Sequence, residues 1–273
     1  MTSPIDMFAL MDGMKQKEQP FALATVVRTV SVTAAKAGAK ALILPDGTVL
    51  AGWIGGGCAR GATLKAAREA LADGQPRLVS IQPEDLLEDL GVHAGETREG
   101  VRYVSNMCPS KGTMDIFVEP VLPRPELVVM GASPVAVALV SLAPQFGFSV
   151  TAAAPAADHA KFAGADRMAD GFAPPPASGP RFVVVSTQGA GDLAALTAAL
   201  GLEARHVAFV GSRRKAQTLS EKLRAAGVPP ARLDALKAPA GLDLGAITPE
   251  EIALSILAEL VLVRRRDQRG AVS

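Results

Sequence analysis

From Glu126 onward, short apolar runs alternate with stretches of good helix formers, and this alternation limits the possible folds more than any other feature. The apolar runs lie at residues 127–130, 148–153, 182–187 and 206–211. Each is apolar throughout instead of at every second residue, so the sheet that they form must be covered on both faces. Strands that alternate with helices are typical of a parallel sheet, and residues 126–273 are therefore expected to form an α/β domain.

The preceding residues follow a different pattern, in which short β-branched or apolar runs are separated by turn signals. Pro45-Asp46-Gly47 predicts a hairpin turn between strands at 39–44 and 48–54. A helix is expected from Ala59 to about Ala72. Prolines at 120, 123 and 125 are typical of a short stiff linker. We expect a smaller mixed α+β domain over residues 1–120, a linker over 121–125, and the parallel α/β domain over 126–273.

Charge and composition exclude several classes of protein. Lys and Arg total 28 and Asp and Glu total 27, which gives a net charge of +1, and aromatic residues make up only 4%. We therefore expect no nucleic-acid partner. The apolar run at 252–263 is too short to span a bilayer and contains Glu259. Two cysteines do not form a disulfide framework, and the first residues lack a signal-peptide pattern, so a cytoplasmic protein without membrane insertion is expected.

One of the two cysteines stands at a position that favours chemistry. Cys58 follows Gly55, Gly56 and Gly57 and lies at the start of the expected helix. Glycines let another group approach the backbone, and a helix N-terminus stabilises an anion and so favours a thiolate. Arg60 would strengthen this effect if its side chain folds back toward the turn. We expect a reactive or ligand-binding thiol; the alternative is a small buried core residue.

The second cysteine, Cys108, precedes the strand expected at 114–119. Two cysteines alone make a poor zinc site, and none of the three histidines shows ligand spacing relative to them. If the fold brings Cys58 and Cys108 together, the two thiolates could hold a soft ion such as Cu(I) or carry a persulfide. Both are therefore candidate catalytic and metal-binding residues.

The C-terminal domain opens with a strand, turn and helix in the position of a dinucleotide fingerprint, which predicts a Rossmann-like fold. The turn contains Gly131, Ala132, Ser133, Pro134 and Val135, a degraded version of the glycine-rich pattern. The next strand ends at Ala154 without an acidic residue for a ribose hydroxyl. Helix N-terminal N–H groups remain available for a phosphate, but we do not expect standard recognition of NAD.

Two further features lie near the ends of later helices. Ser212, Arg213 and Arg214 follow a strand and begin a helix, which predicts either a phosphate-binding loop or a solvated basic turn. The final helix is expected to begin with a capping box at Thr248–Glu251 and to end in a solvated run, Arg264–Arg266.

Recurrent motifs are spread over both expected domains. They comprise Ala24–Arg28, Gly38-Ala39, Gly55–Cys58, Phe117–Pro120, Gly211–Lys215, Gly241–Gly245 and Thr248–Glu259. In these motifs, and in the position of Cys108, the chain resembles the accessory proteins that mature xanthine dehydrogenase and related molybdenum hydroxylases. The resemblance extends from about Phe21 to Arg266.

The resemblance implies a maturation chaperone. Such a protein binds molybdenum cofactor, as molybdopterin or its cytosine dinucleotide, helps a cysteine desulfurase exchange an oxo group for sulfido, and delivers the cofactor to the apo-enzyme's large subunit. We also expect a homo-oligomer. The residues expected to contact the cofactor are Gly55, Gly56, Gly57, Arg60, Gly131, Ala132, Ser133, Pro134, Val135, Ser212, Arg213 and Arg214.

Several positions depart from the family pattern. Arg60 stands where an acidic residue is usual, and Pro109, Ser110 and Lys111 stand where glycines usually surround the second cysteine. These differences favour the branch that serves aerobic carbon monoxide dehydrogenase, whose site holds molybdenum, sulfur and copper, so copper is a further candidate ligand.

Two other functions stay open at this level. The strand, turn and helix at 127–145 are compatible with an oxidoreductase that binds FAD, NAD or another dinucleotide. The chain could also be a structural assembly partner with inert, buried cysteines. Whether it turns over a substrate is not decided by the sequence.

Overall fold

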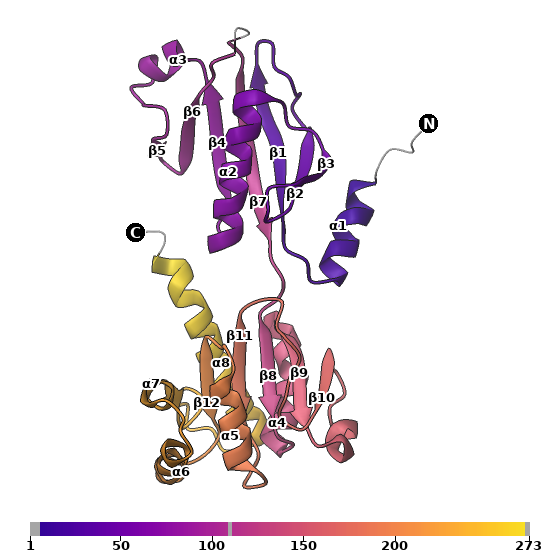
Figure 1. Ribbon diagram of the computed structural model, residues 1–273, viewed down its shortest axis with the longest axis vertical. Coiled ribbons are helices and arrows are strands. Elements are labelled where there is room, and N and C mark those ends of the chain that lie inside the picture. Colours follow the sequence, from indigo (N-terminus) through magenta and orange to yellow (C-terminus); the bar gives the residue numbers. More distant parts are fainter. Residues whose placement is uncertain (1–5, 109–110, 271–273) are drawn as a thin grey trace. The chain divides into compact units, whose positions relative to one another are not determined.

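A computed structural model describes residues 6–108 and 111–270, with side chains described up to residue 266 (Figure 1). The chain divides into two compact units, residues 1–123 and 124–273, and each is treated by itself. Within the described residues, no helix combines the length and apolar character needed to cross a membrane.

The described residues of the first unit form a seven-stranded mixed sheet in the order β3-β2-β1-β7-β4-β6-β5. Neighbouring strands are antiparallel except β4 and β6, which are parallel. The strands are β1 Phe21–Val30, β2 Lys40–Ile43, β3 Val49–Gly52, β4 Arg77–Gln82, β5 Thr97–Arg98, β6 Val101–Ser105 and β7 Thr113–Val121, and the helices are α1 Met7–Gln16, α2 Gly57–Asp73 and α3 Glu84–Asp89.

Alternation along the strands divides the core of this unit between the two faces of the sheet. Ala22, Ala24 and Val26 of β1 belong to a cluster that includes buried residues of α2. Phe21 belongs to a second cluster that includes Met14 of α1. Because successive strand residues point to opposite faces, α2 covers one face and α1 covers the other. Helix α2 begins shortly after the end of β3, and its first turn contains Cys58 (Figure 1).

The second unit contains a parallel sheet in the order β10-β9-β8-β11-β12-β13. In chain order this is 3-2-1-4-5-6, the common order of dinucleotide-binding Rossmann domains, with the order reversing between β8 and β11. The strands are β8 Glu126–Met130, β9 Ser149–Ala154, β10 Arg167–Asp170, β11 Arg181–Val185, β12 His206–Phe209 and β13 Leu236–Lys237.

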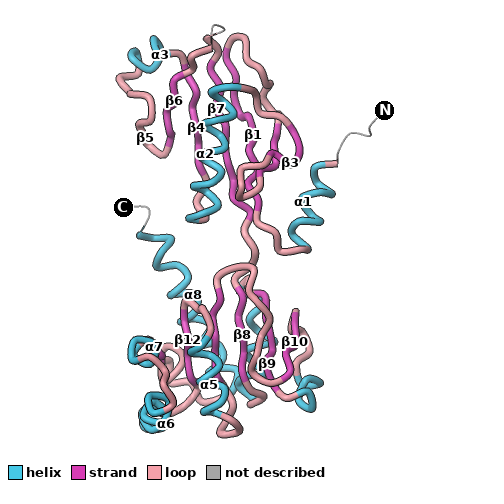
Figure 2. Tube along the Cα trace, in the orientation of Figure 1, coloured by secondary structure: helices cyan, strands magenta, loops and turns pink. Residues whose placement is uncertain are grey.

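Helices cover both faces of this sheet (Figure 2). Residues of α4 and α8 pack with Leu127 and Val129 of β8, whereas residues of α5, α6 and α7 pack with Val128 and Met130 of the same strand. The α-helices are α4 Pro134–Leu142, α5 Asp192–Gly201, α6 Arg213–Ala225, α7 Pro230–Asp234 and α8 Pro249–Gly270, with 3-10 turns η1 Ala143–Phe146 and η2 Ala156–Lys161. The predicted α/β class, with a mixed domain followed by a Rossmann-like domain, is confirmed.

The amino end of the parallel sheet carries a buried polar cluster. Glu126, at the start of β8, accepts hydrogen bonds from Arg181 Nε at 2.7 Å and Thr151 Oγ1 at 2.7 Å. Arg167 lies 3.3 Å from the same carboxylate. The carboxylate of Glu126 is thus satisfied within the core. In open parallel sheets, ligands bind at the opposite, carboxyl end of the strands.

Several elements differ from the sequence prediction. Strands β5 and β6 lie within residues 83–111, where the sequence predicted no strand. Strand β7 extends through Val121, which the sequence placed in the linker. The prediction that Arg264 is solvated is wrong, because its guanidinium lies 4.8 Å from the ring centroid of Phe148 and donates to the carbonyl of Phe146 at 3.0 Å.

Candidate functional site

The glycine-rich turn of the first unit places Cys58 in the first turn of α2, as the sequence predicted. Gly56 is the N-cap of this helix and, lacking a side chain, provides no capping hydrogen bond. Cys58 is half-buried and Cys108 is exposed, and both are free thiols. The first turn of α2 therefore presents a thiol together with backbone N–H groups that no side chain of the N-cap satisfies.

A small pocket lies where the loop of Cys108 meets the turn that contains Cys58. Its volume is about 60 Å³, and Cys108 lines it together with Gly56 and Ala59, which flank Cys58. Asn106 holds this loop, since its Nδ2 donates to the carbonyl of Gly112 at 2.6 Å and its Oδ1 accepts from the N–H of Cys108 at 3.0 Å. The two thiol-bearing segments thus meet, although they lie far apart in sequence.

The surroundings of these thiols limit the chemistry available to them. Arg60 is exposed on the first turns of α2. Among the described residues, no group of three or more His, Cys, Asp or Glu side chains is arranged to hold a metal ion. Pro109 and Ser110, which follow Cys108, lie outside the described residues. The two thiols are therefore the candidate ligands that these described residues offer to a soft ion.

In the second unit, the fingerprint loop between β8 and α4 is closely packed. Gly131 has φ +105°, and a Cβ at this position would lie 2.5 Å from the carbonyl oxygen of Ser186, at the end of β11. The hydroxyls of Ser133 and Ser186 are hydrogen-bonded at 2.6 Å and buried. Only glycine fits at position 131, because any side chain there would collide with the backbone of Ser186.

The N–H donors of this loop are largely engaged. Ser133 Oγ accepts from the N–H of Ala136 at 3.1 Å, and Pro134 at the first position of α4 has no N–H. The N–H of Ser133 donates to the carbonyl of Ser186 at 3.4 Å. Ala132 is half-buried and Val135 is buried. The residues predicted from the fingerprint thus lie together, but few of their donors face a ligand.

A buried carboxylate connects this closed region with the next loop. Asp192, at the start of α5, accepts from the hydroxyl of Thr187, from the N–H of Gly189 at 3.2 Å, and from Lys215 Nζ at 2.6 Å. Burial opposes ionisation of this carboxyl, but the three donors outweigh burial and lower the pKa of Asp192. Lys215 is consequently used within the fold, and its Nζ also lies 5.6 Å from the ring centroid of Phe209.

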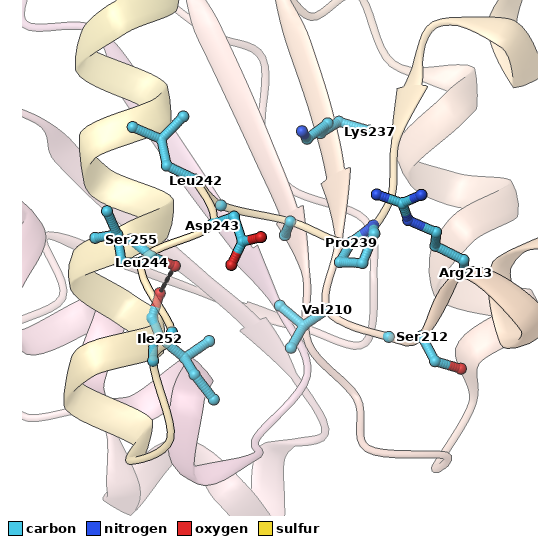
Figure 3. A pocket seen from close by; sticks show the side chains of 15 residues that line it. Val210, Ser212, Arg213, Lys237, Pro239, Leu242, Asp243, Leu244, Ile252 and Ser255 are labelled. Atoms are coloured by element: carbon cyan, nitrogen blue, oxygen red, sulfur yellow. Dashed lines mark hydrogen bonds between the residues drawn. The ribbon is translucent and has the colours of Figure 1, made fainter.

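The loop between β12 and α6 opens onto a pocket of about 640 Å³ (Figure 3). Ser212 caps α6 by accepting from the N–H of Lys215 at 3.3 Å. Ser212 and Arg213 line this pocket, whereas Arg214 lines a separate shallow depression beside α6. The residues of the predicted basic loop therefore line two separate surfaces. Of its two arginines, only Arg213 lines the larger pocket.

The opposite wall is formed by the segment between β13 and α8 and by the first turns of α8. Figure 3 shows Asp243 on the side of α8, with its carboxylate directed toward the space between the lining residues. Apolar lining residues are Val210, Pro239, Leu242, Leu244 and Ile252. A volume of this size, with apolar walls and a few charged groups, is typical of a site for a small organic ligand.

A buried carboxylate supports this wall. Glu259 of α8 accepts from the N–H of Gly241 at 2.8 Å and from Lys237 Nζ at 3.2 Å, and His206 Nε2 lies 3.6 Å away. Burial raises the pKa of Glu259, but these neighbours outweigh it and lower the pKa overall. Gly241 has φ +93°, and a Cβ there would lie 2.3 Å from Ser255 Oγ. The loop is thus fixed against α8.

Sequence reasoning assigned no site role to Lys237 or Asp243. Lys237 belongs to a strand of two residues that no apolar run announces. Asp243 lies in the Gly241–Gly245 motif, which contributed to the family resemblance. The glycine spacing of that motif was the available signal, because it indicates a fixed loop next to the final helix.

In the first unit the Cys108 loop meets the turn that contains Cys58, and the second unit has a Rossmann fold. Comparison with known families identifies the class of this protein. Residues 14–82 match the family described as the XdhC and CoxI family, and residues 127–260 match the XdhC Rossmann domain. The chain belongs to the XdhC and CoxI family, as the resemblance predicted.

Two curated proteins are similar to the chain in sequence. YqeB of Escherichia coli strain K12, an uncharacterized protein, is 30% identical over an alignment that covers 95% of this chain and 47% of that protein. A protein of Bacillus subtilis strain 168, named as a probable subunit of xanthine dehydrogenase, is 29% identical over 56% of this chain and 47% of its own length. The chain thus spans about half the length of these curated relatives.

A crystal structure from Bacillus halodurans, described as that of a xanthine dehydrogenase, also aligns with the chain. The alignment has 20% identity and a TM-score of 0.45 and covers 94% of this chain and 95% of that one.

Proposed function

We propose that this protein is an accessory factor that matures a molybdenum hydroxylase of the xanthine dehydrogenase type. Membership of the XdhC and CoxI family, together with a relative named as a probable subunit of xanthine dehydrogenase, supports this role. The observation that carries the proposal is the meeting of the Cys108 loop with the turn of Cys58 in the first unit. A maturation factor needs accessible thiols of this kind to handle sulfur or a soft metal.

The cargo that we propose is molybdenum cofactor, as the free pterin or its cytosine dinucleotide. The 640 Å³ pocket of the second unit offers Arg213 for a phosphate, apolar walls for a ring, and the Asp243 carboxylate for the N–H groups of an aminopyrimidine. When bound, this group supplies the molybdenum and the dithiolene sulfurs of the client's site. The chain's own residues would hold it through Arg213, Asp243 and the apolar walls.

The partners follow from this cargo. A cysteine desulfurase would pass the terminal sulfur of its persulfide to the Cys58 thiolate, so that one S–S bond forms as another breaks and the desulfurase thiol is released. The apo large subunit of the client would then receive the cofactor. A client of the carbon monoxide dehydrogenase type would also require copper, for which two thiols are suitable ligands.

Co-expression of a client enzyme with variants of this chain tests the thiol proposal. Cys58→Ser is expected to leave the protein folded but to yield a client with little activity and a deficit in cyanide-labile sulfur. Gly61→Ser is the control, because it adds an exposed hydroxyl one turn further along α2 where a Cβ meets no atom within 4 Å. Client molybdenum, copper and sulfur are measured with activity. A fully active, fully sulfurated client from Cys58→Ser would overturn the sulfur-handling role.

Calorimetric titration of the purified chain tests the pocket. The free and cytidylylated pterin cofactors, FAD and NAD are the probes. Arg213→Gln is expected to weaken cofactor binding about tenfold, the effect of losing one charge-assisted contact. Arg214→Gln is the matched control, because Arg214 lines the other depression. Selective binding of FAD or NAD would favour the oxidoreductase alternative, and equal effects of the two substitutions would exclude this pocket.

A further inference from the structure

Helix α8 carries an exposed apolar stripe on the side that faces away from the sheet. Leu254 is 48% exposed and Leu262 is 39% exposed, although buried residues of the same helix form part of the core. Ala258 and Val261 are half-buried between them. Residues spaced by three and four positions share one side of a helix, so these four side chains form a continuous stripe.

A groove of about 280 Å³ lies on this stripe. Its lining includes Ala258, Val261, Leu262 and Arg265 of α8. These positions are spaced as i, i+3, i+4 and i+7, which is the arrangement of four residues that accepts a side chain from a facing helix. The groove is therefore suited to receive a side chain from a facing helix.

The charges at the two ends of the stripe are opposite. Glu250 and Glu251 lie in the first turn of α8 and are exposed, whereas Arg265 and Arg266 lie four turns later and are exposed as well. A second copy of the same helix, running in the opposite direction, would place acidic residues beside basic ones at both ends. A parallel copy would place like charges together.

We propose that α8 pairs antiparallel with α8 of a second copy of this chain, about a two-fold axis at Ala258. In this register Leu254 enters the groove beside Leu262 of the partner subunit, and Glu250 faces Arg266 of the partner subunit. The small side chain of Ala258 lets the helices approach closely at the axis. Each contact occurs twice, as a two-fold interface requires.

The size of the surface predicts the strength of the pairing. One helix pair buries less area than a standard protein interface, and exposed Leu244 and Ile247 before α8 extend the apolar surface. We expect a dimer with a dissociation constant on the order of micromolar. The inference does not depend on the proposed cofactor or client.

Cysteine cross-linking of the full chain tests the axis and the direction. In a Cys58→Ser, Cys108→Ser background, Ala258→Cys is expected to give a disulfide-linked dimer on mild oxidation. A mixture of Leu254→Cys and Leu262→Cys chains is expected to give mixed dimers, whereas Leu262→Cys alone gives few. Efficient linking of Leu262→Cys to itself would indicate a parallel pair and overturn the proposal, as would failure of Ala258→Cys to link.

Sedimentation equilibrium of the unmodified chain tests the pairing without covalent capture. Ala258→Glu places two like charges at the axis and is expected to raise the dissociation constant at least about tenfold. Ala194→Glu, at an exposed position in the first turn of α5, is the matched control and should leave it unchanged. A monomer at all concentrations, or a dimer that is insensitive to Ala258→Glu, would overturn the proposed pairing of α8.

Discussion

Two loops of the Rossmann unit have the same local design and opposite outcomes. The loop before α4 and the loop before α6 each follow a parallel strand and each end in a capping serine, Ser133 or Ser212. Ser133 is buried against Ser186 of the adjacent strand, whereas Ser212 is exposed at the rim of a 640 Å³ pocket. The usual position of a dinucleotide is thus tightly packed, and the open pocket lies farther along the sheet.

The difference teaches that a strand-turn-helix motif supplies a ligand site only where its neighbours leave room. In the first loop, the end of β11 approaches Gly131 and its N–H groups are engaged by the protein. In the second, the loop borders an open pocket, and the segment after β13 supplies Asp243 to the opposite wall. If this contrast is correct, substitutions in the closed loop should affect stability and those in the open loop should affect binding.

The largest effect is expected from Gly131→Ala. A methyl group there would collide with the backbone of Ser186 and would also impose strain at positive φ, so we expect a loss of about 3 kcal/mol or more in the stability of the second unit. Gly189→Ala is the control, because Gly189 has φ +101° but a methyl group there would meet no atom within 4 Å. Denaturant unfolding of both variants is followed by circular dichroism. Tryptophan fluorescence is unsuitable because the single tryptophan, Trp53, lies in the first unit.

Ser133→Ala should have the next largest effect. The change removes the cap of α4 and leaves the buried hydroxyl of Ser186 without its partner, which costs about 2 kcal/mol. Ser212→Ala removes an exposed cap and should cost only about 0.5 to 1 kcal/mol. The same unfolding measurement compares the pair, and equal losses would contradict the distinction between a closed and an open loop.

Asp192→Asn tests how much the ionised carboxylate that links the two loops contributes to stability. The test is the pH dependence of the free energy of unfolding. The pKa of Asp192 is lowered in the folded protein, so its ionised form stabilises the fold at pH values above the unfolded pKa, near 4, and this contribution is lost as the pH falls through the lowered value. We expect the variant to be less stable by about 1 kcal/mol at pH 7 and the difference to shrink below about pH 4. A difference that stays constant from pH 7 to pH 3 would show that ionisation of Asp192 is not involved.

The smallest effect on stability is expected from Arg213→Gln. Arg213 is exposed, and no hydrogen bond or ion pair ties it to another described residue, so the free energy of unfolding should change by less than about 0.5 kcal/mol. Cofactor binding should nevertheless weaken, which separates a binding residue from a structural one. A large loss of stability would show that Arg213 has a structural role, like the residues of the loop before α4.

The sequence was sufficient where a pattern is local. Fully apolar strands predicted the parallel sheet, and the turn Pro45–Gly47 predicted the hairpin between β2 and β3. The glycine-rich turn before Cys58 correctly placed that cysteine in the first turn of a helix. By contrast, β13 has two residues and β5 has two, so neither is long enough to carry a periodic signal.

What the sequence by itself determined was the fold class, the family, and the residues able to carry chemistry, because these depend on local periodicity and residue type. Tertiary structure alone decided which of those residues share a site. It brought the Cys108 loop to the turn of Cys58, engaged Lys215 with Asp192, and placed Asp243 across a pocket from Arg213. Such contacts depend on strand order and on how loops from distant segments pack, and neither is encoded in the spacing of neighbouring residues.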